Sequence, residues 1–126
     1  MKVNNCIRNL LKLICLLQEN SVNKTCLEDG CIKPYLGPSI NQICYNTRVI
    51  TLYTKNGTLL SSNYLDNGNI VNSSFFRVEK VLDNCVTLRV LAFDGANYIS
   101  TNSFITVNLS CICAVKCILD VVVDNL

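Results

Sequence analysis

A chain of 126 residues, half of them hydrophobic, is long enough to form one domain with a buried core. Its net charge of +2 comes from interspersed acids and bases, so no basic patch predicts binding to nucleic acid or to an anionic membrane. The absence of histidine removes the most common general base and the most common metal ligand. The apolar runs 10–17 and 115–123 are short and carry charges, which argues against a signal peptide and a membrane span.

The first expected element is an α-helix over about residues 6–19, in an N-terminal helical segment 1–20. A helical period predicts one apolar stripe, formed by Cys6, Leu10, Leu13, Ile14 and Leu17. On this interpretation Cys6 is a buried free thiol that packs as a small hydrophobic residue. Cys15 lies on the polar side with Arg8 and Lys12, whose positive charges favour the reactive thiolate.

Residues 21–47 are predicted to be an irregular, cysteine-containing loop region, because two glycines and two prolines interrupt any regular element. The region carries Cys26, Cys31 and Cys44. A loop with so few apolar anchors is typically held by disulfides or packed against a neighbour.

Residues 48–126 are expected to form a mainly β unit, an antiparallel β-sandwich or a barrel-like domain, within a single domain 1–126. Short strands alternate here with turn signals. The strongest of these is Asn56-Gly57, which predicts a hairpin between residues 48–55 and 58–65. The later turn signals are Asn67-Gly68, Asp83-Asn84 and Asp94-Gly95.

A two-residue turn at Asp83-Asn84 pairs the strand 73–82 with the strand 85–93. In that register Arg77 and Glu79 face two apolar residues, Val90 and Leu88. Either the two charged side chains form a partly buried pair, or a β-bulge shifts the register. A structural ion pair is the simpler interpretation, and a contact between subunits is the alternative.

The segment 104–123 holds three cysteines within seven residues. If one strand continues through it, a single face carries Ile105, Val107, Leu109, Cys111, Cys113, Val115 and Cys117. Cys111 and Cys113 would then lie about 6.6 Å apart with parallel side chains, so each more easily meets a different partner.

Nine cysteines cannot all pair within one chain, and this frequency is typical of disulfide-containing proteins. The absence of a targeting signal instead predicts synthesis in the cytosol. A protein that assembles inside a cell and is oxidised once that cell is gone could combine synthesis in the cytosol with later disulfide formation. The cross-link candidates are Cys15, Cys26, Cys31, Cys44, Cys85, Cys111, Cys113 and Cys117.

Three motifs occur in one order along the C-terminal half. They are Phe-Phe-Arg-Val-Glu at 75–79, Cys-x-Thr-Leu at 85–88 and Cys-x-Cys-Ala-x-x-Cys at 111–117. Together they resemble the spore coat protein Z family of coat and exosporium proteins. The resemblance is close over 75–118 and loose over most of the rest of the chain. It departs from the family pattern in the segment 93–104, which is shorter than usual, and in the extra Cys15.

The resemblance implies a structural protein without catalytic activity or cofactor. It implies synthesis in the mother-cell cytosol and a final location in the spore coat or exosporium. The implied partners are copies of the protein itself, as rings that tile into disulfide-linked sheets, and other coat or exosporium proteins.

A metal-binding domain is the alternative function. Cys111, Cys113 and Cys117 could ligate zinc or an iron–sulfur cluster if Cys26 or Cys31 completed four thiolates. Paired Cys-x-x-Cys motifs are absent, however, and Cys-x-Cys on a strand is a less usual chelate. An enzyme is disfavoured because no histidine could activate a cysteine and no glycine-rich phosphate loop is present.

Overall fold

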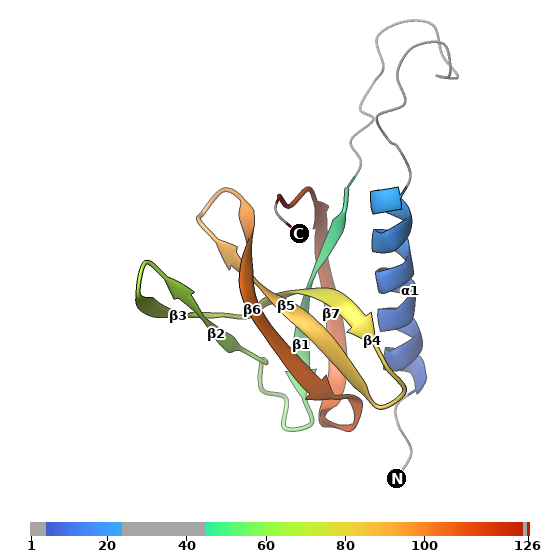
Figure 1. Cartoon of the computed structure of the whole chain (residues 1–126). Coiled ribbons are helices and arrows are strands. Elements are labelled where there is room, and N and C mark those ends of the chain that lie inside the picture. Colours follow the sequence, from blue (N-terminus) through green and yellow to red (C-terminus); the bar gives the residue numbers. More distant parts are fainter. Residues whose placement is uncertain (1–4, 24–44, 125) are drawn as a thin grey trace, which may run out of the picture.

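The computed structural model describes residues 5–23, 45–124 and 126 (Figure 1). One helix precedes seven strands, and a short 3-10 turn separates the last two strands. The elements are α1 (Asn5–Asn23), β1 (Thr47–Thr54), β2 (Ser62–Asp66), β3 (Asn69–Ser73), β4 (Phe75–Val81), β5 (Cys85–Phe93), β6 (Tyr98–Asn108), η2 (Leu109–Cys111) and β7 (Ile112–Val121). The helix is not long and apolar enough to cross a membrane, judged on the described residues.

The mainly β fold class is confirmed. Five antiparallel strands form one sheet in the order β6-β5-β4-β1-β7, and β2 and β3 form a separate hairpin. The sheet curls, because its two outer strands are joined directly through η2 although they lie at opposite edges. In the described part of the chain these edges are not hydrogen-bonded to each other, so the barrel is not closed.

The turn signals are confirmed, but one hairpin prediction is wrong. Asn67 and Gly68 both have positive φ angles, 50° and 84°, as a two-residue turn between β2 and β3 requires. A turn also forms at Gly57, whose N–H donates to the carbonyl of Thr54 at 2.8 Å. The segment after it makes one isolated bridge, Tyr53 to Leu59, and then leaves to form β2. Leu60 still donates its N–H to the carbonyl of Leu52 at 2.8 Å, and beyond it the chain pairs with β3 rather than with β1.

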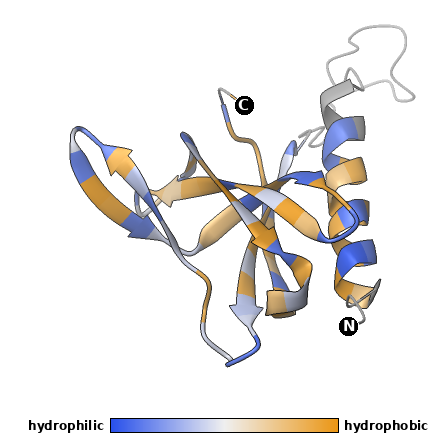
Figure 2. Cartoon of the chain, turned by 60° about the horizontal axis from the view of Figure 1, so that its bottom comes forward, coloured by the Kyte–Doolittle hydropathy of each residue, from blue (hydrophilic) through white to orange (hydrophobic). Residues whose placement is uncertain are grey.

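The predicted apolar stripe of α1 is also wrong. The helix buries Ile7, Leu11, Ile14 and Gln18, a set rotated by roughly 100° from the expected one. Leu13 and Leu17 are exposed instead, and hydrophobic residues recur along the coloured part of the helix in Figure 2. Because more than one side of this helix is apolar, periodicity alone could not select the buried side.

The main core lies between α1 and the concave face of the sheet. Its central strands contribute the fully buried Ile50, Leu52, Phe76, Val78, Val86, Leu88 and Val90. A smaller cluster around Val49, Leu91 and Val123 lies on the other face of the sheet.

The pairing of β4 with β5 contains both features expected as alternatives, the Arg77–Glu79 ion pair and a β-bulge. The turn sets the expected register for Val81 and Val86, and a bulge at Glu79 then shifts it by one residue. Beyond the bulge, Arg77 faces Arg89 rather than Val90. The shift keeps Phe76 and Val78 on the core side of the sheet.

The segment 104–123 is not one strand, which corrects the expected row of thiols. Leu109 is buried at a corner where its N–H donates to the carbonyl of Asn84 at 2.8 Å. The side-chain oxygen of Asn108 accepts from the N–H of Ser110 and caps the 3-10 turn. The corner sends β6 along β5 and β7 along β1, so Cys113 and Cys117 lie on a different strand from Ile105.

Candidate functional site

Three exposed thiols gather at the start and along the length of β7. Cys111 ends the 3-10 turn, and Cys113 and Cys117 follow on the strand. Cys85, at the start of β5, is half-buried. The candidates Cys26, Cys31 and Cys44 lie outside the described residues.

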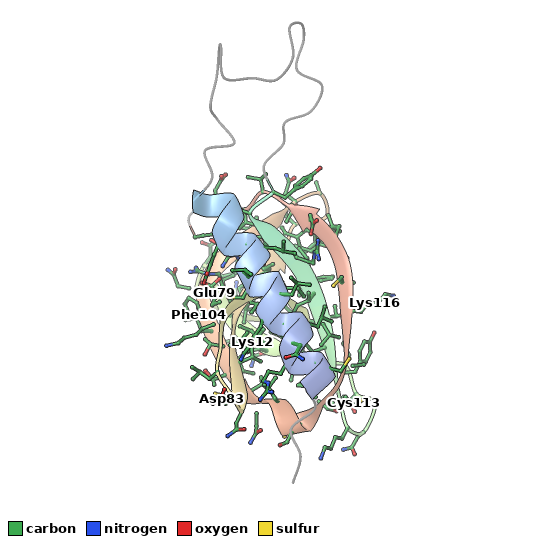
Figure 3. All side chains as sticks on the ribbon, turned by 90° about the vertical axis from the view of Figure 1, so that its right-hand side faces the viewer. Lys12, Glu79, Asp83, Phe104, Cys113 and Lys116 are labelled. Carbon is green, nitrogen blue, oxygen red and sulfur yellow. The ribbon has the colours of Figure 1, made fainter. Side chains whose placement is uncertain are left out.

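β7 is an edge strand with two bulges. It pairs with β1, and the opposite edge has no neighbouring strand in the described part of the chain. The extra residues of the bulges are Cys113 and Ile118, and the stretch 114–117 between them pairs regularly. Figure 3 shows Cys113 and Lys116 on this outer side of the molecule, beside the helix.

An ion pair lies on β7 next to its thiols. The guanidinium of Arg48 donates to both carboxylate oxygens of Asp120, at 2.7 and 3.1 Å. The hydrogen bond from Arg48 lowers the pKa of Asp120, and the hydrogen bond to Asp120 raises the pKa of Arg48. Because each side chain is about one-third exposed, at 33% and 37%, solvent screens the pair and limits its contribution to stability.

The structure reverses the expected roles of the two helix cysteines. Cys6 is exposed rather than buried, whereas Cys15 is half-buried and packs against the core. Burial raises the pKa of Cys15, and the nearby carboxylate of Glu19 raises it further. The thiol also contacts the carbonyl of Glu79 at 3.7 Å, inside a groove of about 360 Å³ between α1 and β4. Cys15 is therefore held as a thiol, which is the opposite of the sequence-based expectation.

We expect Cys15 to react slowly with a thiol reagent. In the reduced protein at pH 8, alkylation at Cys15 should lag behind alkylation at Cys113, because burial limits access and the raised pKa lowers the thiolate fraction. The rate at Cys15 should continue to increase above pH 9. Time-resolved peptide mass spectrometry measures both rates, and equal rates at the two sites would contradict the assignment.

A buried network of three charges holds β4 and β5 beside the helix. Glu79 bonds Arg77, and its second oxygen lies 3.5 Å from Arg89. Arg77 also donates to the hydroxyl of Thr47 at 2.9 Å. The guanidinium of Arg89 lies 4.5 Å from the ring centroid of Phe104 on β6. The network therefore spans four neighbouring strands, and the sequence identified its Arg77–Glu79 pair but not Arg89.

Gln18 is a positioning residue that the sequence did not reveal. Its side-chain nitrogen donates to the carbonyl of Val78 on β4 at 2.7 Å, and its side-chain oxygen accepts from the N–H of Arg48 on β1 at 3.0 Å. β1 and β4 pair only at Ile50 and Phe76. If the two strands continued to pair, the N–H of Arg48 and the carbonyl of Val78 would belong to the next pair of the ladder. The amide thus bridges two strands that part to admit the helix. The available signal in the sequence was a glutamine at position 18 that continues the helical spacing of the apolar residues 7, 11 and 14.

The described residues include no group of three or more side chains that could hold a metal ion. Cys111, in the 3-10 turn, and Cys113 and Cys117, on β7, do not form such a group. The metal-binding alternative is therefore not supported by the part of its ligand set that the structure describes.

Comparison with known proteins identifies the family of the chain. The family model for spore coat protein Z matches residues 1–99. The chain is 33% identical to spore coat protein Z of Bacillus subtilis (strain 168), over 93% of this chain and 90% of the relative. No solved structure matches. The chain belongs to the spore coat protein Z family, a family of structural proteins of the spore coat.

Proposed function

We propose that this protein is a building block of the spore coat that assembles with copies of itself into extended sheets, which disulfides then reinforce. Cysteine-rich composition and family membership support a structural role. The observation that carries the proposal is the exposure of Cys113 and Cys117 on the edge strand β7, with the exposed Cys111 in the turn before it. Thiols placed there can reach another molecule.

The second edge of the sheet supports assembly without covalent bonds. β6 is eleven residues long and contains neither a charged residue nor proline. Proteins usually protect exposed edge strands with charges, prolines or short length, because their free N–H and C=O groups pair readily with another chain. The β6 edge has neither charges nor prolines, although its pairing with β5 is bulged between Ser100 and Phe104 and β2 contacts it. The remainder of this edge is suited to contact with a neighbouring subunit or another coat protein.

Non-covalent contacts should precede the disulfides, because a disulfide requires Cα atoms within about 7 Å. We therefore expect purified protein to form ordered oligomers, rings or sheets in both reducing and oxidising buffer, with greater resistance to dilution after oxidation. Electron microscopy and sedimentation in the two buffers measure this. A monomer under both conditions would contradict assembly, and complete dissociation by reductant alone would contradict the order of events.

A further inference from the structure

The spacing of the thiols on β7 matches a pairing of this strand with a second copy of itself. Cys113 and Cys117 lie at the two ends of the five-residue stretch centred on Val115. Both side chains are exposed, and the outer edge of the strand faces no other strand in the described part of the chain. Among the two edge strands of the sheet, only β7 carries cysteine, since residues 98–108 contain none.

An antiparallel pair centred on Val115 is self-complementary. If Val115 faces Val115 of the second copy, Cys113 faces Cys117 of the second copy, and the same pair recurs across the two-fold axis. Directly opposed residues in antiparallel strands have Cα atoms about 4.5–5.5 Å apart. This separation lies within the range of about 4.4–6.8 Å that a disulfide requires.

The charges on β7 are compatible with this register. Lys116 faces Ala114 of the second copy, so the two lysines are not directly opposed. Asp120 already bonds Arg48 within its own chain. The regularly paired residues 114–116 supply the central backbone groups of the new ladder, and the bulge residue Cys113 and Cys117 lie at its two ends.

The helix gives this side of the molecule an apolar border. Lys12 and Cys15 line the groove against β4, so the opposite flank of α1, with Leu10, Leu13 and Leu17, lies on the side of β7, which α1 also contacts. Leu13 is 50% exposed and Leu17 is 43% exposed. Figure 3 shows the helix between Glu79 on one side and Lys116 on the other. A partner that approaches the β7 edge therefore meets hydrophobic side chains.

We infer that β7 pairs with β7 of a second copy and that two symmetric disulfides, each between Cys113 of one copy and Cys117 of the other, lock the pair. The inference rests on the proposed function and specifies one of its contacts. Each disulfide forms as two thiols lose two protons and two electrons. Dioxygen is the oxidant, and one molecule of it accepts the four protons and four electrons from both bonds to give two molecules of water.

The test uses full-length protein with light and heavy isotopes, mixed in reduced form, oxidised in air and digested with trypsin. Cleavage after Lys116 separates the two thiols into the peptides 90–116 and 117–126. Carrying Cys111→Ser in every protein removes the second thiol of the first peptide. We expect the two peptides to be linked in all four isotopic combinations. The reduced proteins are mixed under conditions in which sedimentation shows that subunits exchange. Links then confined to light–light and heavy–heavy pairs would mean a bond within one chain and would overturn the inference.

Two further variants test the register. Light Cys113→Ser and heavy Cys117→Ser proteins should each lose the link to background when oxidised alone. Their mixture should restore it in one form only, a light 117–126 peptide joined to a heavy 90–116 peptide. No restoration, or restoration in another isotopic form, would refute the β7 pairing.

Peptide mass spectrometry detects the Cys113–Cys117 disulfide whether or not the oxidised protein has assembled, whereas electron microscopy shows whether sheets have formed. Sheets that form without this link would refute the β7 pairing and leave the proposed function intact. Protein that stays monomeric and unlinked would refute both.

Discussion

Replacing Gln18 by methionine is expected to lower the free energy of unfolding by about 2 to 6 kcal/mol. Methionine has a similar length and shape but no hydrogen-bonding amide. The carbonyl of Val78 and the N–H of Arg48 would lose their partners at a position that the helix covers. Each buried backbone group left without a partner costs about 1 to 3 kcal/mol. Urea denaturation followed by circular dichroism measures the change.

The matched control is Leu13→Met on the exposed flank of the same helix. It should change the stability by less than about 0.5 kcal/mol, because surface substitutions away from special contacts usually do. If the two variants were equally stable, the strands would not depend on the Gln18 amide for their connection.

Replacing Glu79 by glutamine should have an effect of similar size, a loss of about 3 kcal/mol or more. Arg77 and Arg89 face each other across β4 and β5, and they are only 8% and 9% exposed. The carboxylate between them is the charge that offsets their repulsion. A neutral amide keeps the volume of the side chain but leaves two buried positive charges without compensation.

Asp120→Asn is the control for this second prediction. It removes the carboxylate of a well-formed ion pair at a site about one-third exposed, where such a pair contributes about 0 to 1 kcal/mol. Thermal unfolding of both variants should show the larger decrease in melting temperature for Glu79→Gln. The opposite ranking would falsify the view that burial makes the Glu79 network the more important one.

Features that depend only on neighbouring residues, such as turns and the alternation of side chains along a strand, could be predicted from the sequence. Asn67-Gly68 forms its turn because those residue types tolerate positive φ angles wherever they occur. The alternation in β5 correctly placed Val86, Leu88 and Val90 on one face. The bulge at Glu79 was anticipated as one of two options, because a continuous register would have set charges against apolar residues.

Properties that depend on distant segments could not be predicted in this way. The buried side of α1 is chosen by the gap between β1 and β4, which no helical period encodes. For the same reason the exposure of Cys6 and Cys15 was predicted in reverse, since the burial of Cys15 comes from β4, more than sixty residues away in the chain. The corner at Leu109 depends on its contact with Asn84 in another turn.

The order of strands in the sheet has a consequence for synthesis on the ribosome. β1 ends at Thr54 and makes one paired contact with β4, so its main partner is β7, which begins only at Ile112. Until that segment leaves the exit tunnel, the nascent chain exposes an incomplete sheet with a high-contact-order pairing still to form. The strand that finishes the fold is also the one that carries Cys113 and Cys117. Under the proposed β7 pairing, a cross-link through those two thiols therefore cannot form before the other strands of the sheet have been synthesised.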